Sequence, residues 1–205
     1  MAGANATASI RSSRWAIDFA NGVACPGCRG GDALASLKEL RAWARRHAVA
    51  RAEDLSSSDL SVLRRFRSAV RQALEARVGR RRPTPLVLEL INRSAADAPE
   101  LVRVSWHRGV WTAVASQSPT TAVRQLKSVI ARSAVELLSG VDSRHLRRCA
   151  GPGCIHFLVA SRPAQRWCSP TGCGNRARVQ RHYRKVHPSS PRRPRTLPRD
   201  GTKPL

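Results

Sequence analysis

Apolar side chains recur every three or four residues in four stretches of the chain, a spacing that places them along one face of a helix. The stretches cover residues 37–47, 59–78, 85–91 and 121–139 and follow Ser36, Ser58, Thr84 and Thr120. Ser36 and Thr84 suit helix starts because their hydroxyls can accept hydrogen bonds from free backbone amides. Gly79 and Gly140 suit helix ends. The pattern therefore predicts four amphipathic helices.

Three other stretches have the shorter period or the apolar run expected of strands. Residues 15–19 (WAIDF) form an apolar run before a glycine-rich loop, and we expect a strand there. Residues 101–106 and 110–115 flank His107, Arg108 and Gly109, which predicts a β-hairpin. The segment 1–140 is thus predicted to be a domain of mixed helices and a hairpin.

The charge of the chain points to a polyanionic partner. The formal net charge is +24, from 37 basic and 13 acidic residues, and residues 143–199 contain fourteen basic side chains and no acidic one. Such an imbalance concerns partners rather than fold. The first ten residues lack the pattern of a secretory signal, and no run approaches the length of a membrane span. We therefore expect a cytoplasmic, nucleoid-associated protein with no membrane partner.

Four cysteines have the spacing of a metal site. Cys149 and Cys154 enclose four residues, thirteen residues precede Cys168, and four more precede Cys173. Two turns that each present a pair of thiolates can complete a tetrahedron around Zn²⁺, with no position left for water. We expect one structural zinc ion on Cys149, Cys154, Cys168 and Cys173. An iron–sulfur cluster or free thiols remain the alternatives.

The segment 141–187 around these cysteines is predicted to be a small zinc finger of the treble-clef type. Residues 155–161 and 164–168 are expected to pair as a hairpin that turns at Arg162 and Pro163, and residues 175–186 are expected to be helical. Val179, Tyr183 and Val186 share one face of that helix, which should pack on the hairpin. Beyond it, proline-rich residues 188–205 predict a disordered basic tail.

The opposite face of this helix and the neighbouring loops are candidates for nucleic-acid contact, because basic side chains gather there without acidic ones. The candidate residues are Arg162, Arg166, Arg178, Arg181, His182, Arg184 and Lys185. Trp167 is expected to cover the zinc site rather than to stack on a base. Asn175 and Arg176 are expected to brace the second cysteine loop. Phosphate contacts would dominate such binding and make it depend on salt.

The sequence RRCAGPGCIHFLVASRPAQRWCSPTGCGNRARVQRHYR resembles the CGNR zinc finger family, named for residues 173–176. The upstream segment resembles the ABATE domain through IDFAN (17–21) and LASLKELRAW (34–43). This resemblance implies a bacterial, stress-linked transcription regulator whose N-terminal domain senses a ligand. Two positions depart from the family pattern: Val159 replaces an acid that would partner Arg176, and Gly22 follows Asn21 where a threonine is usual.

The sequence supports other functions less well. Cys25 and Cys28 (CPGC) are favoured as two ordinary loop thiols, with a redox-sensing pair as the alternative. No GxSxG, HExxH or GxxxxGK[ST] sequence is present, so we expect no enzyme. The overall prediction is an α+β protein that binds DNA and carries a small-molecule site in residues 1–140. An RNA-binding or ribosome-associated zinc protein is the second hypothesis, and an enzyme in the N-terminal domain is the third.

Overall fold

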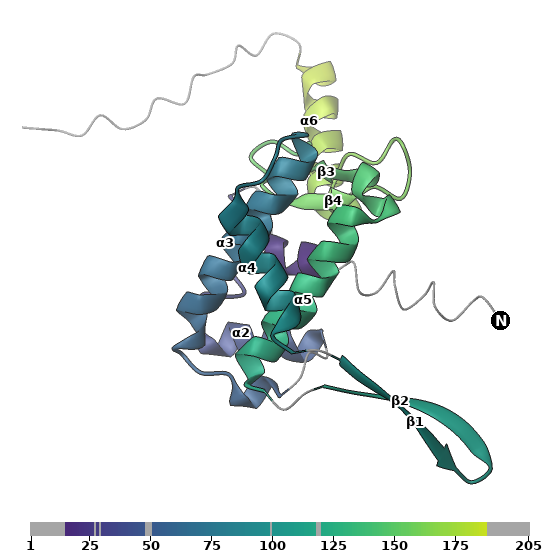
Figure 1. Ribbon diagram of the computed structural model, residues 1–205. Helices are drawn as coiled ribbons and strands as arrows, with labels where there is room; N and C mark the ends of the chain where they lie inside the picture. The colour runs from purple at the N-terminus through teal and green to yellow at the C-terminus, as the bar shows by residue number, and fades with distance from the viewer. Residues whose placement is uncertain are drawn as a thin grey trace, which may run out of the picture.

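The computed structural model describes residues 15–187 except 27, 29, 48–50, 99 and 118–119, and only the backbone at 100–103 and 114–117. Helices α3 (Asp59–Val78), α4 (Pro85–Ala96) and α5 (Ala122–Ser139) lie against one another in the centre of the molecule (Figure 1). Helix α2 (Leu37–Arg46) lies toward one end of these helices and the finger toward the other. The expected tail at 188–205 lies outside the described residues.

The four predicted amphipathic helices are confirmed, and local chemistry explains their ends. The Ser36 side chain accepts a hydrogen bond from the Glu39 amide at the start of α2, and Pro85 occupies the first turn of α4. The cap of α5 is Thr121 rather than Thr120, because the Thr121 side chain accepts from the Arg124 amide. Short 3₁₀ turns occur at Ala52–Asp54 and Val141–His145.

Residues 15–21 are a helix, so the expected strand at 15–19 is wrong. Ala16, Phe19 and Ala20 are buried, whereas Asp18 is exposed. Their spacing of three and four residues is that of a helix face, and five residues are too few for the sequence alone to distinguish it from an apolar strand. The edge-to-face contact of Phe19 with Trp43, at a centroid distance of 5.5 Å, joins this helix to α2.

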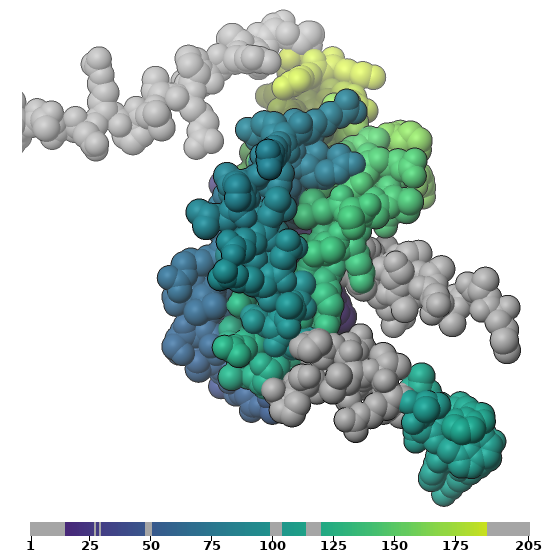
Figure 2. Space-filling view, in the orientation of Figure 1, coloured from purple at the N-terminus to yellow at the C-terminus, as the bar shows by residue number. Residues whose placement is uncertain are grey.

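The long hairpin is confirmed as antiparallel strands β1 (Glu100–His107) and β2 (Val110–Gln117). Arg108 and Gly109 both have positive φ, at 48° and 81°, as a two-residue turn between twisted strands requires. Trp106 faces Trp111 across the ladder with a centroid distance of 4.8 Å, and both rings are exposed. The hairpin extends away from the helical body (Figures 1 and 2).

The second hairpin differs from the prediction. Strand β4 (Phe157–Val159) pairs with β3 (Leu146–Arg148), which precedes the first cysteine, and not with residues 164–168. The carbonyl of Arg166 instead accepts from the Ala150 amide at 2.8 Å. Leu146 and Phe157 are buried in the same core as the helices, which explains why these two segments pair.

Helix α6 (Asn175–Val186) forms where predicted, but its expected packing face is wrong. None of its twelve residues, all of which the structure describes, is buried. Val179, Tyr183 and Val186 are 60, 55 and 56% exposed. The helix follows the π-helical turn Pro170–Gly174 and extends outward from the finger (Figure 1). No helix among the described residues has the length and apolarity needed to cross a membrane.

Candidate metal centre

The structure brings the four predicted cysteine sulfurs together. The Sγ atoms of Cys149, Cys154, Cys168 and Cys173 all lie within 4.8 Å of one another. Cys168 Sγ is 3.8 Å from Cys154 Sγ and 3.6 Å from Cys173 Sγ. A tetrahedral zinc–thiolate centre with bonds of about 2.3 Å has sulfur–sulfur edges of about 3.8 Å. The donor set and its dimensions therefore fit zinc.

Two tight turns position these sulfurs. Cys149 follows β3, and the Cys154 amide closes the first turn by donating to the Gly151 carbonyl at 3.0 Å. Cys173 belongs to the π-helical turn, which Ser169 caps by accepting from the Gly172 amide at 3.0 Å. Each turn thus presents its cysteine through backbone geometry rather than through a long strand.

Backbone amides and burial act on the sulfurs in opposite directions. Burial would raise the pKa of Cys149, but hydrogen bonds from the Cys168 and Gly151 amides, among others, hold that pKa below its ordinary value. Burial raises the pKa of Cys154 to about 11, and it also raises the pKa of Cys168. At neutral pH these two sulfurs need a bound cation to become thiolates, which is what Zn²⁺ provides.

The Cys-Gly-Asn-Arg segment has a structural explanation at three of its four positions. The Arg176 guanidinium donates to Cys173 Sγ at 3.1 Å, so this sulfur supplies the partner that Val159 does not. A Cβ on Gly174 would lie 3.3 Å from the Trp167 ring, so glycine allows the indole to pack beside the turn. Trp167 is partly buried against the cysteine cluster, as expected for a cover.

The candidate nucleic-acid residues are all exposed. On α6 they are Arg178, Arg181, His182, Arg184 and Lys185, and in the preceding loop they are Arg162 and Arg166. Arg178 also donates to the Pro170 carbonyl at 3.2 Å, which ties the start of α6 to the cysteine turn. The cluster therefore faces solvent on a helix that begins at the metal centre.

The CPGC loop meets the metal centre, a contact that the sequence did not indicate. Cys25 and Cys28 form a disulfide, and Cys28 Sγ lies 3.5 Å from Cys154 Sγ. The expectation of two ordinary loop thiols is therefore wrong. The CPGC spacing was visible in the sequence, but nothing local could indicate that a loop 126 residues upstream meets this cysteine.

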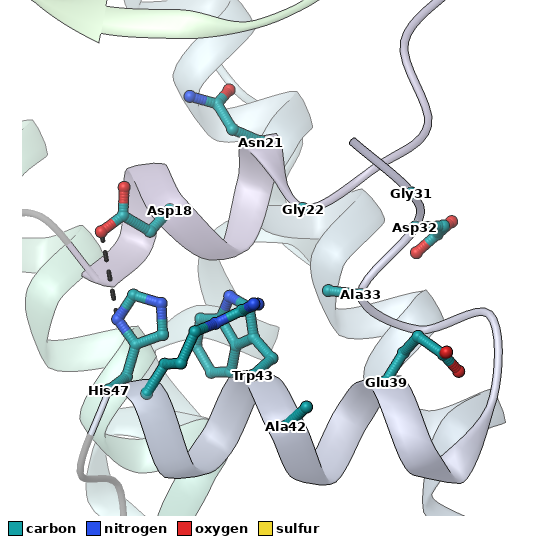
Figure 3. Close-up of a pocket in the computed structure, with 11 residues that line it drawn as sticks. Asp18, Asn21, Gly22, Gly31, Asp32, Ala33, Glu39, Ala42, Trp43 and His47 are labelled. Carbon is teal, nitrogen blue, oxygen red and sulfur yellow. Dashed lines mark ion pairs between the residues drawn. The ribbon is translucent and has the colours of Figure 1, made fainter. Parts of the chain in front are cut away.

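The N-terminal helices also enclose a polar cleft of about 380 Å³ (Figure 3). Its lining includes Asp18, Asp32, Glu39, Trp43 and His47. His47 Nδ1 is 4.0 Å from the Asp18 carboxylate, and its ring stacks near Trp43 with a centroid distance of 4.2 Å. Burial lowers the pKa of His47, against the opposing effect of Asp18, which favours the neutral imidazole.

This fold and this centre define a helical protein with a C-terminal four-cysteine zinc finger. Residues 13–141 match the ABATE family, described as "Putative stress-induced transcription regulator", and residues 145–186 match the CGNR zinc finger. The first match covers more than half of the chain, so the chain belongs to the ABATE family. Its cofactor is one zinc ion. No curated protein matches the sequence.

Proposed function

We propose that this regulator binds DNA through α6 and the loop before it, with Cys149, Cys154, Cys168 and Cys173 as the four zinc ligands. The observation that supports this most strongly is the cluster of exposed basic side chains on a helix whose first turn is tied to the metal centre. Residues 143–187 contain no acidic side chain to neutralise that cluster. Arginine suits phosphate and guanine because its guanidinium can donate two parallel hydrogen bonds.

The zinc ion has a structural role in this proposal. Four thiolates complete its coordination, so no position is open for a substrate or water. In so small a finger the free energy of metal binding contributes directly to folding. The metal therefore determines whether the start of α6 is fixed, and Arg176 and Arg178 attach the helix to that fixed turn.

The salt dependence of DNA affinity tests whether α6 and the loop before it form the DNA-binding surface. Affinity for duplex DNA should fall linearly on a log–log plot against salt, with a slope of about −0.9 per phosphate contact. A variant with Arg178, Arg181 and Arg184 changed to glutamine should weaken binding and flatten the slope by up to about 2.7.

The matched control for this variant changes three exposed arginines away from the finger: Arg65, Arg108 and Arg124. It alters the net charge equally but leaves the proposed interface intact. The slope of the salt dependence should therefore stay nearly unchanged. Equal effects of the two variants would contradict a localised interface. Competition with structured RNA at the same salt, followed by selection of bound duplexes from a random pool, separates a DNA regulator from an RNA-binding protein.

The cleft between the segment 15–21 and α2 is the candidate sensing site. Asp18, Glu39 and the Arg67-paired Asp32 line it together with Arg46, an imidazole and an indole. This leaves a small excess of negative charge, which favours a polar small molecule that carries an amine. A screen of amines monitored by NMR should shift the His47 side-chain resonances if the cleft is the site. An amine that binds but leaves the His47 resonances unchanged in the wild type would place sensing elsewhere.

A further inference from the structure

The CPGC turn lies directly on the metal centre. Within it the Cys28 amide donates to the Cys25 carbonyl at 2.9 Å, and the two sulfurs form a disulfide. Cys25 is buried at 6% exposure and Cys28 is partly buried, both within the cluster that contains Cys149, Cys154 and Cys173. Six cysteines from distant parts of the chain thus share one small apolar region.

Several contacts hold the CPGC turn against the finger. The Asn21 side chain pairs with the Phe157 backbone through two hydrogen bonds of 2.8 Å, one donated and one accepted. Arg71 donates to the carbonyls of Ala20 and Ile155, which joins the helix before the turn to the segment after Cys154. Cys25 Sγ lies 3.8 Å from the Gly153 carbonyl oxygen. The approach of Cys28 to Cys154 is therefore built into the fold.

We propose that Cys25 and Cys28 are a redox site whose disulfide exchanges with the zinc ligand Cys154. Thiol–disulfide exchange requires a thiolate within reach of a disulfide sulfur, and Cys154 Sγ is 3.5 Å from Cys28 Sγ. Zinc supplies the thiolate because a coordinating thiol is deprotonated. The proposal rests on the assignment of Cys154 as a zinc ligand and is independent of DNA binding.

The exchange is balanced within the chain. Cys154 Sγ attacks Cys28 Sγ, the Cys28–Cys154 bond forms, and the Cys25–Cys28 bond breaks. The electron pair of the broken bond leaves on Cys25 Sγ as a thiolate. One disulfide is present before and after, no proton moves, and no outside oxidant or reductant is consumed. The reverse step returns Cys154 to the metal.

The exchange would reduce the number of cysteines that can hold the zinc ion. After exchange Cys154 would no longer be available as a thiolate, so only Cys149, Cys168 and Cys173 of the finger would be left to hold zinc. A dithiol at Cys25 and Cys28 cannot start this reaction. The reduced chain should therefore retain zinc firmly, and the disulfide form should release it more readily.

The test compares the zinc-loaded full chain in its disulfide form with the same chain after reduction by a dithiol that is then removed. Zinc release to a chromogenic chelator is followed in time, and cysteine linkages are mapped by mass spectrometry after acid quenching. The matched control is the double variant Cys25→Ser, Cys28→Ser, which keeps all four finger cysteines.

We expect the disulfide form to release zinc at least about tenfold faster, since even the loss of an outer partner of a metal ligand weakens binding 10–100-fold. Peptides linked through Cys28 and Cys154 should appear in that form, and the double variant should release zinc at the slow rate after either treatment. Equal release from both wild-type forms, with only Cys25–Cys28 linked, overturns the proposal. A reduced chain that binds two zinc ions also overturns it, because the pair would then be a metal site. If neither form binds zinc, the ligand assignment fails and the proposal with it.

Discussion

Single residues set the dimensions of the metal centre. A Cβ on Gly151 would lie 3.0 Å from Cys173 Sγ and 3.1 Å from Cys173 Cβ, closer than such atoms normally approach. Gly151 also donates its amide to Cys149 Sγ at 3.4 Å. One glycine therefore leaves room for the Cys173 sulfur and hydrogen-bonds the Cys149 sulfur.

Gly151→Ala should therefore weaken zinc binding at least about tenfold, because displaced groups around a metal site typically cost 10–100-fold in affinity. Competition with a chelator of known affinity measures this. The control is Ala150→Ser, which adds one atom on the exposed side of the same turn and should leave zinc affinity unchanged. Equal affinities for Gly151→Ala and the wild type would contradict the geometry described.

A second feature of single residues is the partly buried ion pair between Arg67 and Asp32, whose side chains are 9 and 26% exposed. Burial by itself would raise the pKa of Asp32. Hydrogen bonds from Arg67 and the Leu34 amide, with the charges of Arg67 and Arg64, nonetheless hold it below 3.8. A lowered folded-state pKa stabilises the fold above the unfolded value, and this stability is lost as pH falls through the folded-state pKa.

Asp32→Asn should destabilise the chain by roughly 1.5–3 kcal/mol at pH 7, the range for hydrogen bonds to charged groups. The difference from wild type should shrink below pH 4, as the wild-type carboxyl becomes protonated. Urea unfolding at several pH values measures it. Glu89→Gln removes only the exposed pair with Arg93 and should change stability by less than about 0.5 kcal/mol. A difference for Asp32→Asn that is constant down to pH 3 would refute the assignment.

At the scale of elements, strand β4 connects the finger to the helical body. Phe157 is 1% exposed within the core that contains Phe19, Leu74 and Leu137, although it belongs to the finger. Helix α6 makes no comparable contribution, since its apolar side chains are exposed. Stability should therefore depend on β4 far more than on α6.

Phe157→Ala should cost roughly 3–5 kcal/mol, the range for a buried aromatic side chain truncated in a core. Val179→Ala, at 60% exposure, should change stability by less than about 0.5 kcal/mol. Chemical unfolding of the zinc-loaded chain compares the two. A large loss of stability with Val179→Ala would instead indicate that this face of α6 is packed, as the sequence suggests.

The elements differ in how well the sequence predicts them. Helices α2 to α5 have ten or more residues, and a side chain caps α2 and α5 while Pro85 begins α4, so periodicity and these end signals suffice. Residues 15–21 are too short for periodicity to decide between helix and strand. The pairing of β4 with β3 depends on burial of Leu146 and Phe157 in a core formed by distant helices, which no local pattern encodes.

At the scale of the whole molecule, the helical body and the finger share a core and several bridging hydrogen bonds. Arg148 pairs with Glu75 at 2.6 Å, and Asn21 binds the Phe157 backbone. The four metal-site cysteines were predictable because their spacing is local. Their contact with Cys28 was not, because it follows from how the two parts of the chain pack.

We propose that one zinc ion fixes the base of α6 so that its basic face can bind DNA. The most direct measurement is the affinity of the full chain for duplex DNA in the zinc-loaded, chelated and zinc-restored states, with Cys168→Ser alongside. We predict that chelation and Cys168→Ser each abolish tight binding, and that one equivalent of zinc restores it in the wild type alone. Unchanged DNA affinity in the zinc-free chain would show that the metal does not position the DNA-binding helix.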